Sequence, residues 1–451
     1  MKPKSLNERG QALILIAFAA IALVAITGLA IDGSNKYSDR RHAQNAADTA
    51  ALAAALARAN TLTNNPGLAD TEVCPNASPG ILCQAITSSA LGRALDNGYD
   101  NNLVSNEVKV YTCNNPDSDC GPYDGNKNYV QVMITSHVDT YFMRVLGIDQ
   151  SQNIVEAVAL AGKGGAIANG ASVVSMNPHP NCGNGSFNVG GNGEIHLSGG
   201  GMFVNSSESC GYTCDSGSLI LTTNPSGVGI SSAGSTIDQH CGTNLPEIES
   251  APQIMIPEEV YMPERPAQCD QTAATPTHLP NGHWRIYPGY YTDFPQAGLI
   301  GVNQDIELAP GIYCVDGNIH WSGATFDSLD GSSGVTIYIT SGHDFSLSIN
   351  SPIQLNASHG GTKYDGYLVI LDGDPNVHPN CTINGGSYLD MNGTVFAPYC
   401  NITINGDNST TSQFNAQIIG WDVKLNGGNL MNITYDPANN GKIHRRVGLM
   451  K

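Results

Sequence analysis

The sequence predicts an N-terminal transmembrane helix with a stalk, then a small α+β domain, then a mainly-β distal domain. An uncharged apolar run fills residues 11–31, and an alanine-rich helical pattern follows it over residues 32–60. Residues 61–165 mix helical and strand patterns, whereas the Gly/Asn-rich residues 170–441 repeat a short motif at a fixed interval. For the distal domain we expect a β-helix or solenoid, with a β-sandwich as the alternative.

The apolar run QALILIAFAAIALVAITGLAI, residues 11–31, corresponds to roughly 32 Å of helix, enough to cross the hydrocarbon core of a bilayer. A cleaved signal peptide is the alternative, but its apolar region is usually about 7–15 residues long. We therefore expect an uncleaved single-pass anchor, with residues 1–10 as a cytoplasmic tail. Basic side chains flank both ends of the run equally, so the charges alone leave the orientation open.

The cysteines indicate on which side of the membrane the chain lies. The sequence has 12 cysteines and only 13% charged residues. Two cysteine pairs in short polar loops suit disulfide bonds: Cys74 with Cys83, and Cys113 with Cys120. The sequence contains no C-x-x-C pair, so the cysteines do not indicate a zinc site. Because disulfides persist outside the cytoplasm, we expect the bulk of the chain, after the anchor, to be extracytoplasmic or at the cell surface.

The charge of the distal segment excludes one class of partner. Residues 170–441 contain 24 acidic and four basic residues, and the whole chain carries a net charge of −19. A nucleic acid is not an expected partner, because the phosphate backbone requires a basic face. An acidic, lysine-poor surface is typical of a secreted or wall-facing module, although it also serves solubility.

The alanine-rich residues 32–60 are expected to continue the membrane helix, with Gly33 as a weak point. Alanine has the highest helix propensity, so this segment needs little packing support to remain helical. Its small side chains also permit close approach to another helix. Leu52 and Leu56 lie four residues apart and form one ridge for contact. The sequence therefore predicts a membrane-rooted stalk and a candidate assembly surface.

The segment ERGQALILIAFAAIALVAITGLAIDGSNKYSDRRHAQNAADTAALAAAL resembles the N-terminal module of the Tad-like (TadE/TadG) proteins of Flp pilus assembly. The shared pattern is R-G-Q at the membrane edge, an apolar span, Asp32 at its outer end, and then Gln44 and Asp48 within an alanine-rich run. The resemblance implies a single-pass protein of a bacterial cytoplasmic membrane that is a partner of other pilus-assembly proteins. It makes Gln44 and Asp48, together with Leu52 and Leu56, candidates for assembly contacts.

Residues 61–165 are expected to form the small α+β domain. The apolar periodicity predicts a helix over 81–98, strands at 108–110 and 129–135, a short helix over 138–148 and a last strand over 154–162. A strand, a short helix and an alanine/valine-rich strand in this order also recur in Tad-like proteins. The resemblance therefore implies a pseudopilin-like domain.

The distal segment repeats one motif at a fixed interval. INGG begins at residue 383, INGD at 404 and LNGG at 425, so successive copies are 21 residues apart. One short β-unit per repeat fits the coils of a β-helix. We expect Ile383, Ile404 and Leu425 to stack inward and each Asn-Gly to turn a corner where positive φ is needed. Asn-Gly is also a strong hairpin signal, which keeps the β-sandwich open.

Two longer-range disulfides are also predicted. Cys381 and Cys400 are 19 residues apart, close to the repeat interval, so we expect them on adjacent coils. Their offset from the inward isoleucines would hold them apart on a straight strand, but a bend after Pro398 would close the gap. Cys269 with Cys314 is the next expected pair. The proline-rich residues 245–268 are expected to be a linker or a strap across the helix.

The sequence contains no residue set that we assign to catalysis, to a cofactor or to a metal ion, so we expect a non-enzymatic protein. A lyase needs a base and usually a cation, and the distal segment has few basic residues. The aromatic cluster Trp284, Tyr287, Tyr290 and Tyr291 is a candidate for stacking on surface glycans, with packing at the end of the fold as the alternative. A carbohydrate-active β-helix enzyme and a pilus-independent adhesin remain the competing hypotheses.

Overall fold

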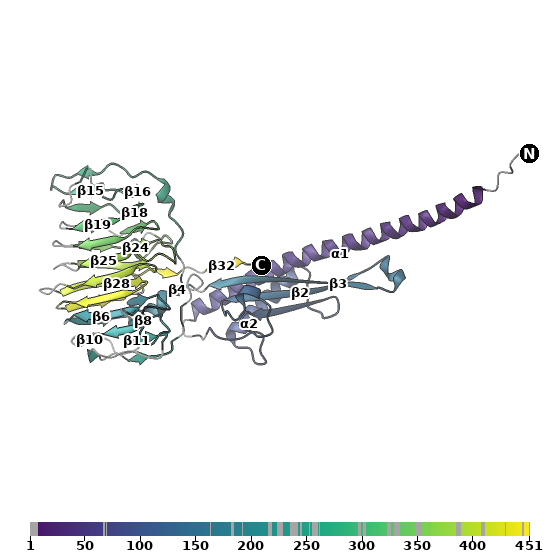
Figure 1. The fold of residues 1–451 in the computed structure, drawn as a ribbon, viewed down its shortest axis with the longest axis horizontal. Helices are drawn as coiled ribbons and strands as arrows, with labels where there is room; N and C mark the ends of the chain where they lie inside the picture. Colours follow the sequence, from purple (N-terminus) through teal and green to yellow (C-terminus); the bar gives the residue numbers. More distant parts are fainter. Residues whose placement is uncertain are drawn as a thin grey trace, which may run out of the picture. The chain divides into compact units, whose positions relative to one another are not determined.

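A computed structural model divides the chain into two compact units (Figure 1). Unit 1 comprises residues 1–164 and 444–451, and unit 2 comprises residues 165–443, so unit 2 is an insertion in the sequence of unit 1. The structure describes residues 8–65, 68, 70–162, 164–181, 185–191, 193–214, 219–222, 229–234, 242–243, 246–251, 253–254, 260, 262–295, 299–300, 304–322, 326–328, 334–348, 353–359, 361–384, 389–406, 411–428, 430–443 and 446–450.

Unit 1 consists of two helices and an antiparallel sheet. Its elements are α1 (Glu8–Asn64), α2 (Ile81–Asp96), β1 (Asn106–Thr112), η1 (Gly121–Tyr123), β2 (Tyr129–Asp139), η2 (Met143–Leu146), β3 (Gln150–Gly162) and β32 (Arg446–Leu449). The strand order is β1-β2-β3-β32. Helix α1 is unbroken, so Gly33 does not interrupt it.

The helix expected over 138–148 is wrong. Strand β2 continues to Asp139, and only the four residues of η2 are helical. Gly147 adopts a left-handed φ of 81° directly after them, which ends the turn. The apolar residues of this segment therefore do not form the buried face of a longer helix.

The alanine-rich half of α1 is the core helix of unit 1 and not an exposed stalk. Its fully buried residues include Ala43, Ala46, Ala47, Ala50, Ala51, Ala54 and Ala55. They belong to one apolar cluster with residues of α2 and of the sheet, including Ile86, Val132 and Ala157. Because alanine side chains are small, the sheet and α2 can approach the α1 backbone closely.

Unit 2 is built mainly from short parallel strands. Its elements are β4 (Gly165–Ala166), η3 (Ile167–Gly170), β5 (Val173–Ser175), β6 (Phe187–Gly191), β7 (Glu194–Ser198), β8 (Met202–Val204), β9 (Tyr212–Cys214), β10 (Leu219–Thr222), β11 (Ile230–Ser232), β12 (Gly242–Thr243), β13 (Glu247–Ile248), η4 (Ala267–Asp270), β14 (Thr277–His278), β15 (Trp284–Ile286), β16 (Gly289–Tyr291), β17 (Ile306–Leu308), β18 (Gly311–Val315), β19 (Ile319–Ser322), β20 (Phe326–Ser328), β21 (Val335–Ile339), β22 (Phe345–Ser348), β23 (Ile353–Asn356), β24 (Tyr367–Leu371), β25 (Asn380–Asn384), β26 (Leu389–Ala397), β27 (Asn401–Asn405), β28 (Thr411–Gly420), β29 (Val423–Gly427), β30 (Leu430–Thr434) and β31 (Lys442–Ile443).

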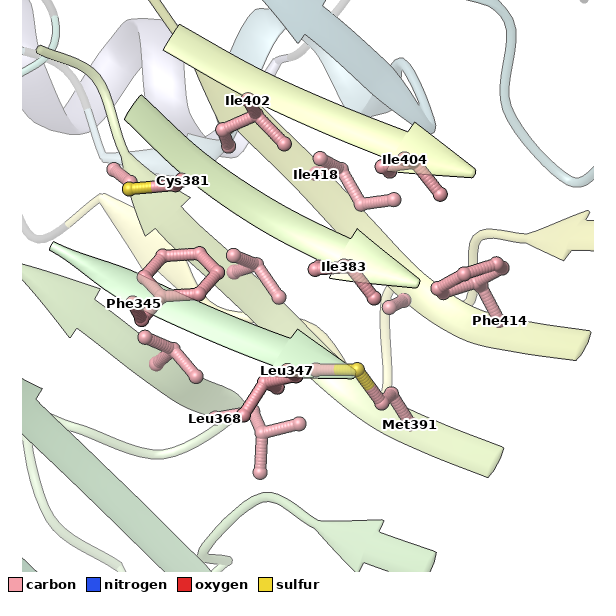
Figure 2. Close-up of a cluster of buried hydrophobic side chains, with 14 of the residues drawn as sticks. Phe345, Leu347, Leu368, Cys381, Ile383, Met391, Ile402, Ile404, Phe414 and Ile418 are labelled. Atoms are coloured by element: carbon pink, nitrogen blue, oxygen red, sulfur yellow. The ribbon is translucent and has the colours of Figure 1, made fainter. Parts of the chain in front are cut away.

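The repeated motif forms neighbouring strands of one ladder, whose order is β19-β22-β25-β27-β29-β6-β9. Ile383 pairs with Ile404, and Ile404 pairs with Leu425, in parallel register. All three are fully buried, which confirms the predicted inward stacking. Ile383 and Ile404 share the apolar interior with Met391 and Phe414 (Figure 2).

The asparagines and glycines of the motif stabilise this stacking in different ways. Asn426 donates a hydrogen bond to Asn405, and Asn405 donates one to Asn384, each with an Nδ2···Oδ1 distance of 2.6 Å. The predicted positive φ is wrong at the glycines of the second and third copies, Gly406 and Gly427. A Cβ atom on Gly406 would lie 2.8 Å from a backbone nitrogen of the neighbouring strand's turn. Glycine is required there because two backbones approach closely.

The chain enters and leaves unit 2 at the same level of the ladders. Strands β5, β6 and β7 pair with β28, β29 and β30, and β4 pairs with β31. From this level the N-terminal strands continue to one end of the ladders at β12 and β13. The chain then resumes at the opposite end with β14 and β15 and returns to the level where it entered (Figure 1).

The segment between β13 and η4 connects the two ends, and its described residues, 249–251, 253–254, 260 and 262–266, form a strap. The apolar row beneath it runs along the outward side of neighbouring strands and includes Phe203, Phe396 and Tyr338. Val260 of the strap is 1% exposed in the same cluster. Of the two structures expected for the proline-rich stretch, the strap is therefore the one that forms. It covers strands whose other side faces the interior.

Candidate functional site

The polar residues of the predicted assembly surface, Gln44 and Asp48, form hydrogen bonds inside unit 1. Gln44 Nε2 donates hydrogen bonds to Asp48 Oδ1 at 2.8 Å and to the backbone oxygen of Glu156 on β3 at 2.9 Å. This arrangement links one turn of α1 to the sheet. The sequence pattern singled out both residues, but it did not indicate that their bonds are internal.

The two leucines of the predicted ridge differ in their surroundings. Leu52 packs against the core of unit 1 as a partly buried residue. Leu56 is 46% exposed. Only Leu56 therefore presents much free apolar surface, and the two side chains do not form one exposed ridge.

Three further α1 residues hold the helix on the sheet, and sequence reasoning did not single out two of them. Asp39 accepts hydrogen bonds from Ser136 and from Asn153 Nδ2, the latter at 2.7 Å. Arg58 is 1% exposed and donates hydrogen bonds to the backbone oxygens of Ala161 at 3.1 Å and of residue 70 at 3.2 Å. An arginine in an alanine-rich helix has no sequence signal for burial, because the acceptors come from distant segments.

Asp32 is the third of these residues, and the resemblance did place it at the end of the span. It is 6% exposed, and its carboxylate accepts hydrogen bonds from three consecutive backbone N–H groups. The donors are Tyr141, Phe142 and Met143, at N···O distances of 2.9, 2.9 and 2.8 Å. Asp32 thus fixes the loop between β2 and β3 on α1.

His42 of α1 is also in contact with Tyr99, the third residue after α2. His42 Nδ1 lies 3.2 Å from the hydroxyl of Tyr99. Burial, together with the neighbouring Asp39 carboxylate, raises the pKa of Tyr99 to about 12. The Tyr99 hydroxyl therefore stays protonated at alkaline pH values at which an exposed tyrosine ionises.

The structure forms the same four disulfides that the sequence analysis predicts. They are Cys74–Cys83, Cys113–Cys120, Cys269–Cys314 and Cys381–Cys400. For the last pair the Cα atoms are 6.1 Å apart, and a turn follows β26 directly before Cys400. The turn brings the chain back to β25 as the predicted bend requires. Cys269–Cys314 joins η4, which follows the strap, to β18.

The aromatic residues proposed for glycan stacking do not share one face. Tyr291 is 2% exposed and stacks on Tyr313 in the interior, so its ring is not available to a ligand. Trp284 is partly buried against the same interior cluster. Tyr290 packs instead against the strap cluster and donates a hydrogen bond to Asp316 Oδ2 at 2.8 Å. Tyr287 is partly exposed. Packing of the end strands explains most of this group.

Comparison with known proteins gives a family match for one segment of the chain. Residues 10–58 match a protein-family model described as putative Flp pilus-assembly TadE/G-like. No curated protein and no solved structure matches the chain. The matched residues are nearly all of α1, including Asp32, Gln44 and Asp48, and they are the segment on which the sequence resemblance rests. The N-terminal helix of this chain is therefore similar to TadE/G-like Flp pilus-assembly proteins.

Proposed function

We propose that the chain is a membrane-anchored component of a Flp/Tad-type pilus-assembly or surface-adherence system. The observation that carries this proposal is the unbroken helix α1, which contains the whole family match. Its apolar side chains between Leu13 and Ile31 are exposed, as a lipid-facing helix requires, whereas most alanines of residues 43–59 are buried in the core of unit 1. Among the described residues, α1 is the helix long and apolar enough to cross a membrane.

We infer that both units lie outside the cytoplasm of a bacterium, with residues 1–10 inside. Disulfides in unit 1 and in unit 2 support this orientation, because reducing conditions in the cytoplasm disfavour them. The acidic composition of unit 2 is consistent with a surface-facing module.

We further infer that unit 2 is a β-solenoid and not a β-sandwich. A sandwich packs antiparallel sheets, often joined by hairpins. The ladders of β25, β27 and β29 and of β26 and β28 are parallel, and their neighbouring strands are separated by one repeat of the sequence. The solenoid is proposed to have a binding or structural role without turnover, with other pilus-assembly proteins or surface glycans as its partners.

The test is a gene deletion in a bacterium that carries this gene together with a Flp-type pilus system. Pilus abundance and surface attachment should fall, and the full chain supplied in trans should restore both. A matched control replaces residues 11–31 with an unrelated transmembrane helix, which retains the anchor and both units. Pilus abundance and attachment that do not change on deletion would contradict the proposal, as would polysaccharide cleavage by the purified chain.

A further inference from the structure

The loop between β2 and β3, residues 140–149, exposes several large apolar side chains. Tyr141, Phe142, Val145 and Leu146 are 68, 41, 87 and 75% exposed. Single exposed apolar residues are ordinary, but a contiguous group of this kind marks a contact surface. We call residues 140–149 the β2–β3 loop. It is the turn at the end of the long β2–β3 hairpin (Figure 1).

The β2–β3 loop is fixed beside the apolar span of α1. The ring of Phe142 lies on Gly28, where a Cβ atom would come within 2.5 Å of the ring carbons Cγ and Cδ1. Gly28 precedes Asp32, the residue that binds the backbone of the loop, by four residues, or about 6 Å along the helix. Gly28 also lies inside the apolar run 11–31. The loop therefore reaches the depth of the last turn of the span.

The charges around the loop suit the boundary of a lipid bilayer. Lys36, Arg40 and Arg41 are exposed on α1 and follow Asp32 by about 6 to 14 Å along the helix. The headgroup layer on each side of a bilayer is about 5–8 Å thick, so these residues begin where lipid phosphates lie. In the loop itself, Arg144 forms an ion pair with Asp149 at 3.2 Å.

We propose that the β2–β3 loop is a second membrane contact, whose apolar side chains enter the bilayer beside α1. This inference rests on the proposed function, since it requires α1 to span the membrane. Lipid is the favoured occupant, and not a partner protein, because the apolar surface of the loop is continuous with the span and lies at the same depth. A tyrosine at this level is also typical of the membrane interface. Two contacts with the bilayer would fix the orientation of unit 1 on the membrane surface.

Tryptophan depth measurements on the full chain test this proposal. The variants are Val145→Trp in the loop and, as the matched control, Ile81→Trp at the first residue of α2, which is 62% exposed. Each chain is reconstituted in phosphatidylethanolamine/phosphatidylglycerol vesicles with or without brominated acyl chains. The three natural tryptophans all lie in unit 2, and the signal of the unsubstituted chain is subtracted.

The expected result is that brominated lipid quenches the added tryptophan of the Val145→Trp chain at least about twofold more strongly than that of the control, with a blue-shifted spectrum. Leu146→Trp provides a second loop variant should the first fail to fold, and it should behave in the same way. Equal quenching in loop and control variants would overturn the inference, and so would quenching that requires an added pilus protein. Flotation of the vesicles tests the membrane anchor separately from the loop contact. Chains that float without loop quenching refute only the loop contact, whereas chains that do not float refute the membrane anchor.

Discussion

Replacing Ile404 by alanine tests the stacking of the repeated motif, and we expect it to destabilise unit 2 by about 3–4 kcal/mol. Core isoleucine-to-alanine substitutions cost about 2–5 kcal/mol, depending on how far the surroundings collapse into the cavity. Ile404 is fully buried between Ile383 and Leu425. Backbone pairing on both sides of its strand, together with the hydrogen bonds of Asn405 to both neighbouring strands, restricts such a collapse. We therefore expect a loss above the lower end of this range.

Tryptophan fluorescence during urea unfolding measures this loss in the full chain in detergent. The three tryptophans of the sequence, Trp284, Trp321 and Trp421, all report on unit 2. With a denaturant dependence on the order of 3 kcal/mol per M, the unfolding midpoint should fall by about 1 M. Thr403→Ala on the same strand is the control, because Thr403 is not in the interior. We expect it to change the free energy of unfolding by less than about 1 kcal/mol. Equal midpoints for the two variants would refute the reasoning.

Three further predictions follow from the contacts in the two units. Replacing both Cys381 and Cys400 by serine should cost unit 2 about 3 kcal/mol, from the chain entropy of a loop closed over 19 residues; an unchanged urea midpoint would contradict this. Asp48→Leu removes the acceptor of Gln44 and should leave membrane insertion intact, measured by carbonate extraction, while lowering pilus abundance. Loss of insertion, or normal pilus abundance, would contradict that prediction. Arg58→Met leaves buried backbone oxygens without their donor and should destabilise unit 1 by about 2–3 kcal/mol. Hydrogen exchange in β3 measures the effect, and unchanged protection would contradict it.

Local patterns predicted the parts of the fold that depend on neighbouring residues. The interval between Ile383, Ile404 and Leu425 predicted their register, because one repeat of sequence is one step along the ladder. Apolar periodicity likewise predicted α2 and the three consecutive strands of unit 1. The cysteine spacing predicted Cys381–Cys400, since Cys381 is in β25 and Cys400 directly precedes β27, the neighbouring strand of the same ladder.

Contacts between distant segments could not be predicted in this way. Strand β32 pairs with β3, although unit 2 separates them in the sequence. The stacking of β29 on β6 likewise has no local signal, because a repeat does not specify which end of the ladder the next segment joins. The burial of Arg58 depends on oxygens supplied by segments far along the chain. The alanine-rich pattern of α1 predicts a stalk although the helix is buried, because small residues suit both an isolated helix and a tightly packed one.

Protease accessibility in spheroplasts tests most directly the central claim that one N-terminal helix anchors both units outside the cytoplasm. For this experiment, one epitope tag is added before Met1 and another after residue 451, the second through a protease-sensitive linker. We expect protease added to intact spheroplasts to remove the C-terminal tag and to spare the N-terminal tag, and we expect both tags to be lost after lysis. Protection of the C-terminal tag in intact spheroplasts, with its loss after lysis, would contradict the account.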